Sequence, residues 1–128
     1  MIPGQLNIIF GWAWMCVGLI LGLVMGMRAE GEQWLGGYTS LTRRYLRLGH
    51  IAFIALSIIN ILYGRELEST GIPAYVGSIG SPLMIFGAAG VPLVCISAAF
   101  FRKAKYFLPL PALAVLVGIG ILVIGMVF

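Results

Sequence analysis

The chain has 128 residues and a mass of 13.8 kDa, and 61% of its residues are hydrophobic while only 9% are charged. Soluble domains are about 45–50% apolar and about 25% charged, so this composition, with a mean hydropathy of +1.07, excludes a soluble monomer. It excludes intrinsic disorder as well, because disordered chains are poor in apolar residues. The net charge of +4 comes from basic residues beside hydrophobic runs, which indicates membrane topology and argues against nucleic acid as a partner.

Four apolar segments are long enough to cross a bilayer, because a hydrocarbon core of about 30 Å needs about 20 helical residues. They are residues 6–27, 44–64, 81–101 and 108–128. Prolines 82 and 109 open the last two segments, and proline suits the first turn of a helix. The segments leave no room for a soluble domain. We therefore predict an all-α, polytopic integral membrane protein with one domain, residues 1–128, whose four transmembrane helices form an antiparallel bundle.

Basic residues gather in the first and third of the three connections between these segments. Those two connections hold Arg28, Arg43, Arg44, Arg47, Arg102, Lys103 and Lys105, and the second holds Arg65 alone. Because cytoplasmic loops carry an excess of Lys and Arg, both termini are expected outside the cytoplasm, in a prokaryotic cytoplasmic (inner) membrane. Aromatic anchors are expected to follow this orientation, with Trp12 and Trp14 near the outer surface and Trp34, Tyr38 and Tyr106 near the inner one.

Four glycines in the first segment indicate a helix-packing face. Gly18, Gly22 and Gly26 repeat every fourth residue, and Gly11 lies one heptad before Gly18. Small residues at this spacing let two membrane helices approach closely. The pattern leaves open whether the neighbouring helix belongs to this chain or to a partner.

The second segment begins with the most polar cluster of the chain. Arg43, Arg47 and His50 are spaced to share one helical face at the inner membrane boundary. This face has two interpretations: topology signals with a hydrogen-bonded histidine, or a site for an anionic lipid, a quinone or a haem. The main prediction is that the chain binds no cofactor. A haem at His50 would need its second axial ligand from another chain, because His50 is the only histidine.

Two features deeper in the bilayer are expected to shape helix packing. Asn60 lies far inside the second segment, where an amide needs an interhelical hydrogen bond. Gly87, Gly90 and Pro92 lie in the third segment, where the proline removes the hydrogen bond from its own nitrogen and predicts a kink. A contact between Asn60 and a substrate, and a hinge at this kink, are the alternative interpretations.

No catalytic or metal-binding pattern is found. Cys16 and Cys95 both lie in apolar stretches and are expected to be buried small hydrophobic residues. No charged residue lies in the centre of a predicted helix, although coupled transport commonly depends on one.

These features favour a non-catalytic structural or accessory subunit of a larger integral membrane complex. A respiratory or other energy-transducing complex is expected because such complexes are common, and not because of particular residues. The partners of this subunit would be membrane lipids and other integral membrane subunits. The first alternative is a lipid-, quinone- or haem-binding membrane subunit that uses the basic face of the second helix. The second alternative is a small homo-oligomeric transporter or channel.

Overall fold

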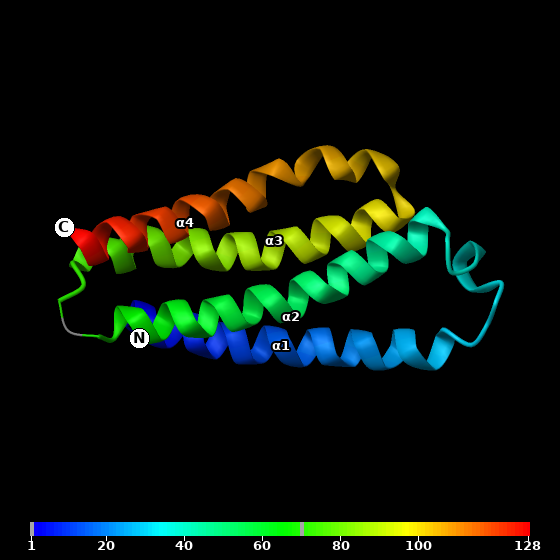
Figure 1. Cartoon of the computed structure of the whole chain (residues 1–128), viewed down its shortest axis with the longest axis horizontal. Coiled ribbons are helices and arrows are strands. Elements are labelled where there is room, and N and C mark those ends of the chain that lie inside the picture. The colour runs from blue at the N-terminus through cyan, green and yellow to red at the C-terminus, as the bar shows by residue number, and fades with distance from the viewer. Residues whose placement is uncertain (1, 70) are drawn as a thin grey trace.

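The computed structural model describes residues 2–69 and 71–128, and over these residues its regular structure is entirely helical (Figure 1). The four long helices are α1 (Pro3–Arg28), α2 (Leu41–Leu67), α3 (Ser81–Phe100) and α4 (Pro109–Val127). Three short helical segments join or precede them, η1 (Trp34–Gly36), η2 (Val76–Gly80) and η3 (Arg102–Phe107). The long helices have the length and composition to cross a membrane, so the prediction of four membrane-length helices is confirmed.

The largest differences from the predicted boundaries lie at the start of α1, which begins at Pro3 rather than residue 6, and at both ends of α2, which spans Leu41–Leu67 rather than residues 44–64. α2 begins at Leu41 rather than residue 44, since the Ser40 hydroxyl accepts a hydrogen bond from the Arg43 backbone N–H and caps the first turn. Before α3, the π-helical segment η2 continues directly into Ser81. The Tyr63 hydroxyl donates to the Val76 carbonyl oxygen and ties this segment to α2.

The helices are arranged as an open layer (Figure 1). Consecutive helices run antiparallel, so both ends of the chain lie at the same end of the layer. α2 packs against α1 and α3, α3 packs against α4, and α1 makes a smaller contact with α3. α1 and α4 lie at opposite edges (Figure 1). The four antiparallel helices are consistent with the expected helix bundle, and each helix packs mainly with its neighbours in sequence.

The glycine face of α1 packs against α2 of the same chain. A β-carbon placed on Gly11 would lie 2.8 Å from the carbonyl oxygen of Ser57, and Gly18 and Gly22 are equally close to side chains of α2. Gly26 is different, since a β-carbon there would have nothing within 4 Å. Three of the four glycines therefore serve intramolecular packing, and the fourth leaves open space.

α1 and α2 also approach each other closely at the terminal end of the layer, where both chain termini lie. A β-carbon on Gly64 would lie 2.5 Å from the Gly4 carbonyl oxygen, and one on Gly4 would lie 2.7 Å from the Gly64 carbonyl oxygen. A side chain on either glycine would collide with the backbone of the other. The two backbones can therefore contact each other directly only because both residues are glycines. This pair lies outside the predicted glycine pattern.

The contact between α3 and α4 also depends on glycines. A β-carbon on Gly87 would lie 2.7 Å from the Pro111 carbonyl oxygen, and one on Gly90 would lie 2.5 Å from the Pro111 β-carbon. Pro92 is buried inside α3, which is helical on both sides of it. Gly87 and Gly90 thus provide room for α4, and the bend at Pro92 stays a prediction.

The two cysteines have different environments. Cys95 is buried in α3, as expected, but Cys16 is exposed on α1, so the expectation of burial is wrong for Cys16. The reason is that α1 lies at the edge of the layer and is covered on one side only. Cys16 lies on the uncovered side.

Candidate functional site

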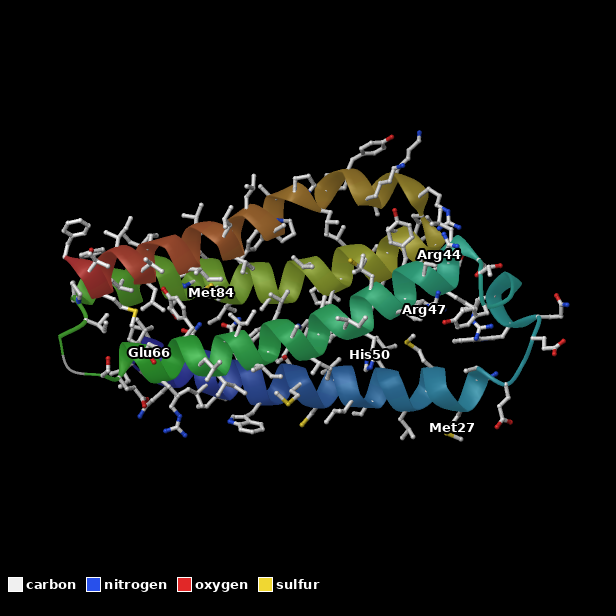
Figure 2. The ribbon with its side chains drawn as sticks, viewed as in Figure 1. Met27, Arg44, Arg47, His50, Glu66 and Met84 are labelled. Atoms are coloured by element: carbon white, nitrogen blue, oxygen red, sulfur yellow. The ribbon has the colours of Figure 1, made fainter. Side chains whose placement is uncertain are left out.

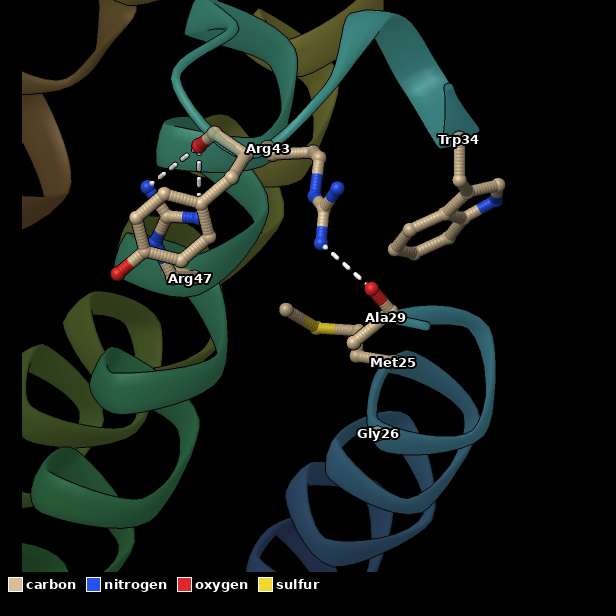
Figure 3. A pocket seen from close by; sticks show the side chains of 7 residues that line it. Met25, Gly26, Ala29, Trp34, Arg43 and Arg47 are labelled. Atoms are coloured by element: carbon tan, nitrogen blue, oxygen red, sulfur yellow. Dashed lines mark hydrogen bonds between the residues drawn. The ribbon is translucent and has the colours of Figure 1, made fainter. Parts of the chain in front are cut away.

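Arg43 lies at the end of the layer opposite the two chain termini, which we call the basic end because most basic residues lie there. It is almost completely buried, with 6% of its surface exposed. Its Nη2 donates to the Ala29 carbonyl oxygen at 3.4 Å (Figure 3), which is long for a hydrogen bond of this type. Its guanidinium carbon lies 5.4 Å from the centre of the Trp34 ring and 5.8 Å from that of Tyr38. Cation–π contacts and one weak hydrogen bond thus surround this charge.

Arg47 lies one helical turn further along α2 and is oriented by Tyr38. Both of its terminal nitrogens donate to the Tyr38 carbonyl oxygen, at 3.2 and 3.3 Å (Figure 3). Its guanidinium carbon lies 4.5 Å from the centre of the Tyr38 ring. The backbone and the side chain of one residue therefore hold Arg47 in place.

The connection before α2 reaches these arginines because it turns back sharply around η1. Leu35, Gly36 and Gly37 have φ values of 51°, 86° and 94°, in the left-handed region that glycine adopts without strain. The Gly37 N–H donates to the Trp34 carbonyl oxygen and closes the turn. This turn brings Trp34 and Tyr38 over the first two turns of α2.

The two arginines line a cavity of about 270 Å³ between the end of α1, the turn and the start of α2 (Figure 3). Its lining residues are Met25, Gly26, Ala29, Trp34, Tyr38, Arg43 and Arg47. Residues from α1 form an apolar wall, and the arginines form the opposite, cationic wall. The cavity can therefore accept an anion that carries an apolar part.

His50 does not line this cavity. Its Nδ1 lies 3.0 Å from the Gly18 carbonyl oxygen, and its ring packs against Gly22 (Figure 2). Because a carbonyl oxygen only accepts hydrogen bonds, Nδ1 carries the proton in this arrangement. The structure thus brings Arg43 and Arg47 together and places His50 against the backbone of α1. The haem hypothesis, which needs His50 Nε2 as a ligand, stays a prediction.

Asn60 belongs to a buried network at the other end of the layer. Its Oδ1 accepts from Asn7 Nδ2 at 2.8 Å, and its Nδ2 donates to the Met84 carbonyl oxygen at 3.2 Å. The Ser81 hydroxyl in turn donates to Asn7 Oδ1. The network links α1, α2 and α3. Sequence reasoning missed Asn7 and Ser81, although Asn7 lies four residues before Gly11 and therefore on the same face of α1.

Trp14 is half-buried between the helices, and its expected role as an anchor at the outer surface stays a prediction. Its indole N–H donates to the Ala88 carbonyl oxygen at 2.8 Å, and its ring packs against Phe10 and Phe53. Ala88 is the residue whose carbonyl loses its helical donor because of Pro92, four residues later. The unpaired carbonyl explains why a tryptophan lies between the helices at this position.

Polar groups therefore gather in two places, the arginine cavity at the basic end and the amide network near the terminal end. The network satisfies its own hydrogen bonds, whereas the cavity holds two cationic groups around open space. In comparisons with known proteins, no family, no curated protein and no solved structure matches this chain.

Proposed function

We propose that the chain is a non-catalytic accessory subunit of a larger integral membrane complex. The observation that carries this proposal is the use of the buried polar side chains. Asn7 is hydrogen-bonded to both Asn60 and Ser81, and Trp14 donates to the backbone of α3. Polar side chains inside membrane helices either mark a solute pathway or hydrogen-bond across helices, and each of these groups is bonded to a neighbouring helix. Their arrangement therefore favours a structural role over a transport role.

The edges of the layer supply the second argument. Helix α4 packs against α3 on one side, and many large apolar side chains on its other side are exposed, such as Leu113, Leu116 and Val123. A β-carbon placed on Gly120 of α4 would have nothing within 4 Å, so the fold of the single chain does not require glycine there. Glycine costs about 1 kcal/mol relative to alanine inside a helix. A partner helix that approaches this bare backbone would account for it.

Substitution of Gly120 tests the proposal. Gly120→Leu is expected to leave the folding of the isolated chain unchanged, because its side chain meets open space, and to remove the partner from the complex. Gly120→Ala is the matched control and is expected to retain the partner, because alanine still permits close approach. Native mass spectrometry of the tagged chain after gentle extraction measures both the partner and its stoichiometry.

Extraction of the wild-type chain as a monomer, or only as a homo-oligomer, would contradict the accessory role. A hetero-complex that persists unchanged in Gly120→Leu would contradict the assignment of this edge of α4 as the interface. A homo-oligomer that Gly120→Leu dissociates would instead favour the transporter or channel hypothesis.

The proposal places both termini outside the cytoplasm, with the arginine cavity at the cytoplasmic end. Seven of the eight basic residues lie at that end, in η3 or in the adjoining turns of α1 and α2, which supports this orientation. Figure 2 shows Arg44 and Arg47 at the end opposite Glu66. The orientation is the basis of the following labelling experiment.

In a variant that carries Cys16→Ala and Cys95→Ala, a cysteine at Ser69 is expected to react with an impermeant maleimide on intact cells. Ser69 is exposed in the connection after α2. Lys103→Cys, exposed in η3 at the other end, is the matched control and should react only after permeabilisation. The reverse labelling pattern would invert the orientation.

A further inference from the structure

The arginine cavity contains a cationic charge that the described residues do not neutralise. The hydrogen bonds that Arg43 and Arg47 make end on the carbonyl oxygens of Ala29 and Tyr38, which are neutral acceptors. The acidic residues of the same connection, Glu30 and Glu32, are exposed, and no ion pair is found between them and either arginine in the described part of the chain. Among the described residues, the two positive charges of the cavity therefore have no negative partner.

Burial makes this charge unusual. Arg43 is more than nine-tenths buried, and a guanidinium has five N–H donors, of which the structure shows one in use, at 3.4 Å. A buried charge is stable when it is paired and its donors are satisfied. Trp34 and Tyr38 provide aromatic faces but no negative charge. An anion in the cavity would supply the missing charge and the missing acceptors.

The arginine pair can bind a phosphate group. Arg43 and Arg47 lie one turn apart on α2 and project into the same cavity (Figure 3). A phosphate has several oxygens, so it can accept hydrogen bonds from both guanidiniums, and it accepts paired hydrogen bonds from a single arginine. Tyr38 holds Arg47 in its orientation in advance, so binding would immobilise few side chains.

The opposite wall indicates that the anion is an amphiphile. Met25 and Gly26 of α1 form an apolar wall, and Gly26 leaves open space where a side chain would otherwise lie. This wall is part of a membrane-length helix, so it leads from the arginines toward the hydrocarbon region. Tryptophan and tyrosine at this level are typical of the headgroup region. A lipid can therefore place its phosphate at the arginines and its chain along α1.

We propose that this cavity binds the phosphate of an anionic phospholipid. Arg43 and Arg47 bind the phosphate oxygens, Trp34 and Tyr38 enclose the headgroup, and the wall at Gly26 contacts the glycerol and the first methylene groups. His50 takes no part in this site. The site is independent of the accessory role, because all of its residues belong to one chain.

The purified full-length chain is tested in detergent by native mass spectrometry with added dioleoyl phosphatidylglycerol and, as comparison, dioleoyl phosphatidylcholine. We expect one phosphatidylglycerol to be retained in preference to phosphatidylcholine. Arg47→Gln should lower the apparent affinity about tenfold, the effect of losing a charge-assisted hydrogen-bond pair. Arg44→Gln is the matched control, because Arg44 is the exposed neighbour of Arg43 and carries the same charge outside the cavity.

Gly26→Leu provides a second variant that does not depend on removing a charge. Its side chain should fill the apolar wall and reduce phosphatidylglycerol retention, while the thermal unfolding midpoint without lipid stays unchanged, because the position meets open space. Equal affinity losses in Arg44→Gln and Arg47→Gln would overturn the proposal, since they would indicate unspecific attraction to the basic end. Unchanged retention in Gly26→Leu would overturn the path assigned to the lipid chain.

Glycerol 3-phosphate distinguishes a lipid from a soluble phosphate ester, since both offer the same phosphate chemistry. We expect it to compete with phosphatidylglycerol only weakly, because it lacks the acyl chains that contact α1. Competition at equal molar concentration would overturn the lipid and assign the cavity to a soluble phosphate ester.

Discussion

Gly64→Ala is expected to destabilise the chain more than any other exchange of a helix glycine for alanine at the contact of α1 and α2. The added methyl would lie 2.5 Å from the Gly4 carbonyl oxygen, 2.8 Å from Ile8 Cγ1 and 3.1 Å from Asn7 Cβ. A backbone carbonyl cannot rotate away as a long side chain can, so α1 must move as a whole. Overpacking of this kind costs about 1–3 kcal/mol, which thermal unfolding in detergent measures as a lower midpoint.

Gly26→Ala is the matched control for this prediction. It adds the same methyl to α1, but with nothing within 4 Å. Alanine is a better helix former than glycine by about 1 kcal/mol, so this variant should be as stable as the wild type or more stable. Equal midpoints for Gly64→Ala and Gly26→Ala would show that the close approach of Gly4 and Gly64 contributes nothing to stability.

Asn60→Leu is expected to have the second large effect. Leucine has a similar size, so the change removes hydrogen bonds with little change in packing volume. Asn7 Nδ2 and the Met84 carbonyl oxygen would lose their partner in a buried site. An unsatisfied buried group costs about 1–3 kcal/mol, and hydrogen bonds between membrane helices average about 0.6 kcal/mol. We therefore expect a loss of about 2 kcal/mol in unfolding free energy.

A double-mutant cycle isolates the amide pair. Asn7→Leu and the double variant Asn7→Leu/Asn60→Leu should show a coupling energy of about 0.6–2 kcal/mol. Ser57→Ala is the matched control on the same helix, because Ser57 Oγ is buried without a hydrogen-bond partner among the described residues. Its removal should change stability little. A cost for Ser57→Ala as large as that for Asn60→Leu would contradict the role of the network.

The number of long apolar helices could be predicted because it follows directly from the apolar composition of the chain. The ends were less predictable, since Ser40 and the polar first turn of α2 extend the helix beyond the apolar segment. Asn60 could be recognised as a residue that needs a partner. Its partners could not, because Asn7 and the Met84 carbonyl oxygen reach it only once α1 and α3 have packed on α2.

The arginine cavity was predictable only in part. Helical spacing groups Arg43, Arg47 and His50 on one face, but spacing alone does not indicate that the Gly18 carbonyl oxygen lies beside His50. The aromatic part of the cavity depends on left-handed backbone conformations at Gly36 and Gly37, which no helical pattern reveals. The contact of Trp14 with α3 could not be predicted from spacing either, because its hydrogen-bond partner is the Ala88 carbonyl oxygen, which Pro92 leaves without a helical donor.

The open layer has a consequence for how the chain is assembled. Helices that follow one another in sequence are joined by the shortest connections that the chain offers, so their pairing costs less loop entropy than pairing of helices further apart in the sequence. α1 can pair with α2, and α3 can then add to that pair, in the order in which a ribosome delivers them. The hydrogen bonds that join Trp14 and Asn7 to α3 can form only when α3 packs, and they then stabilise the helical hairpin that α1 and α2 have already formed.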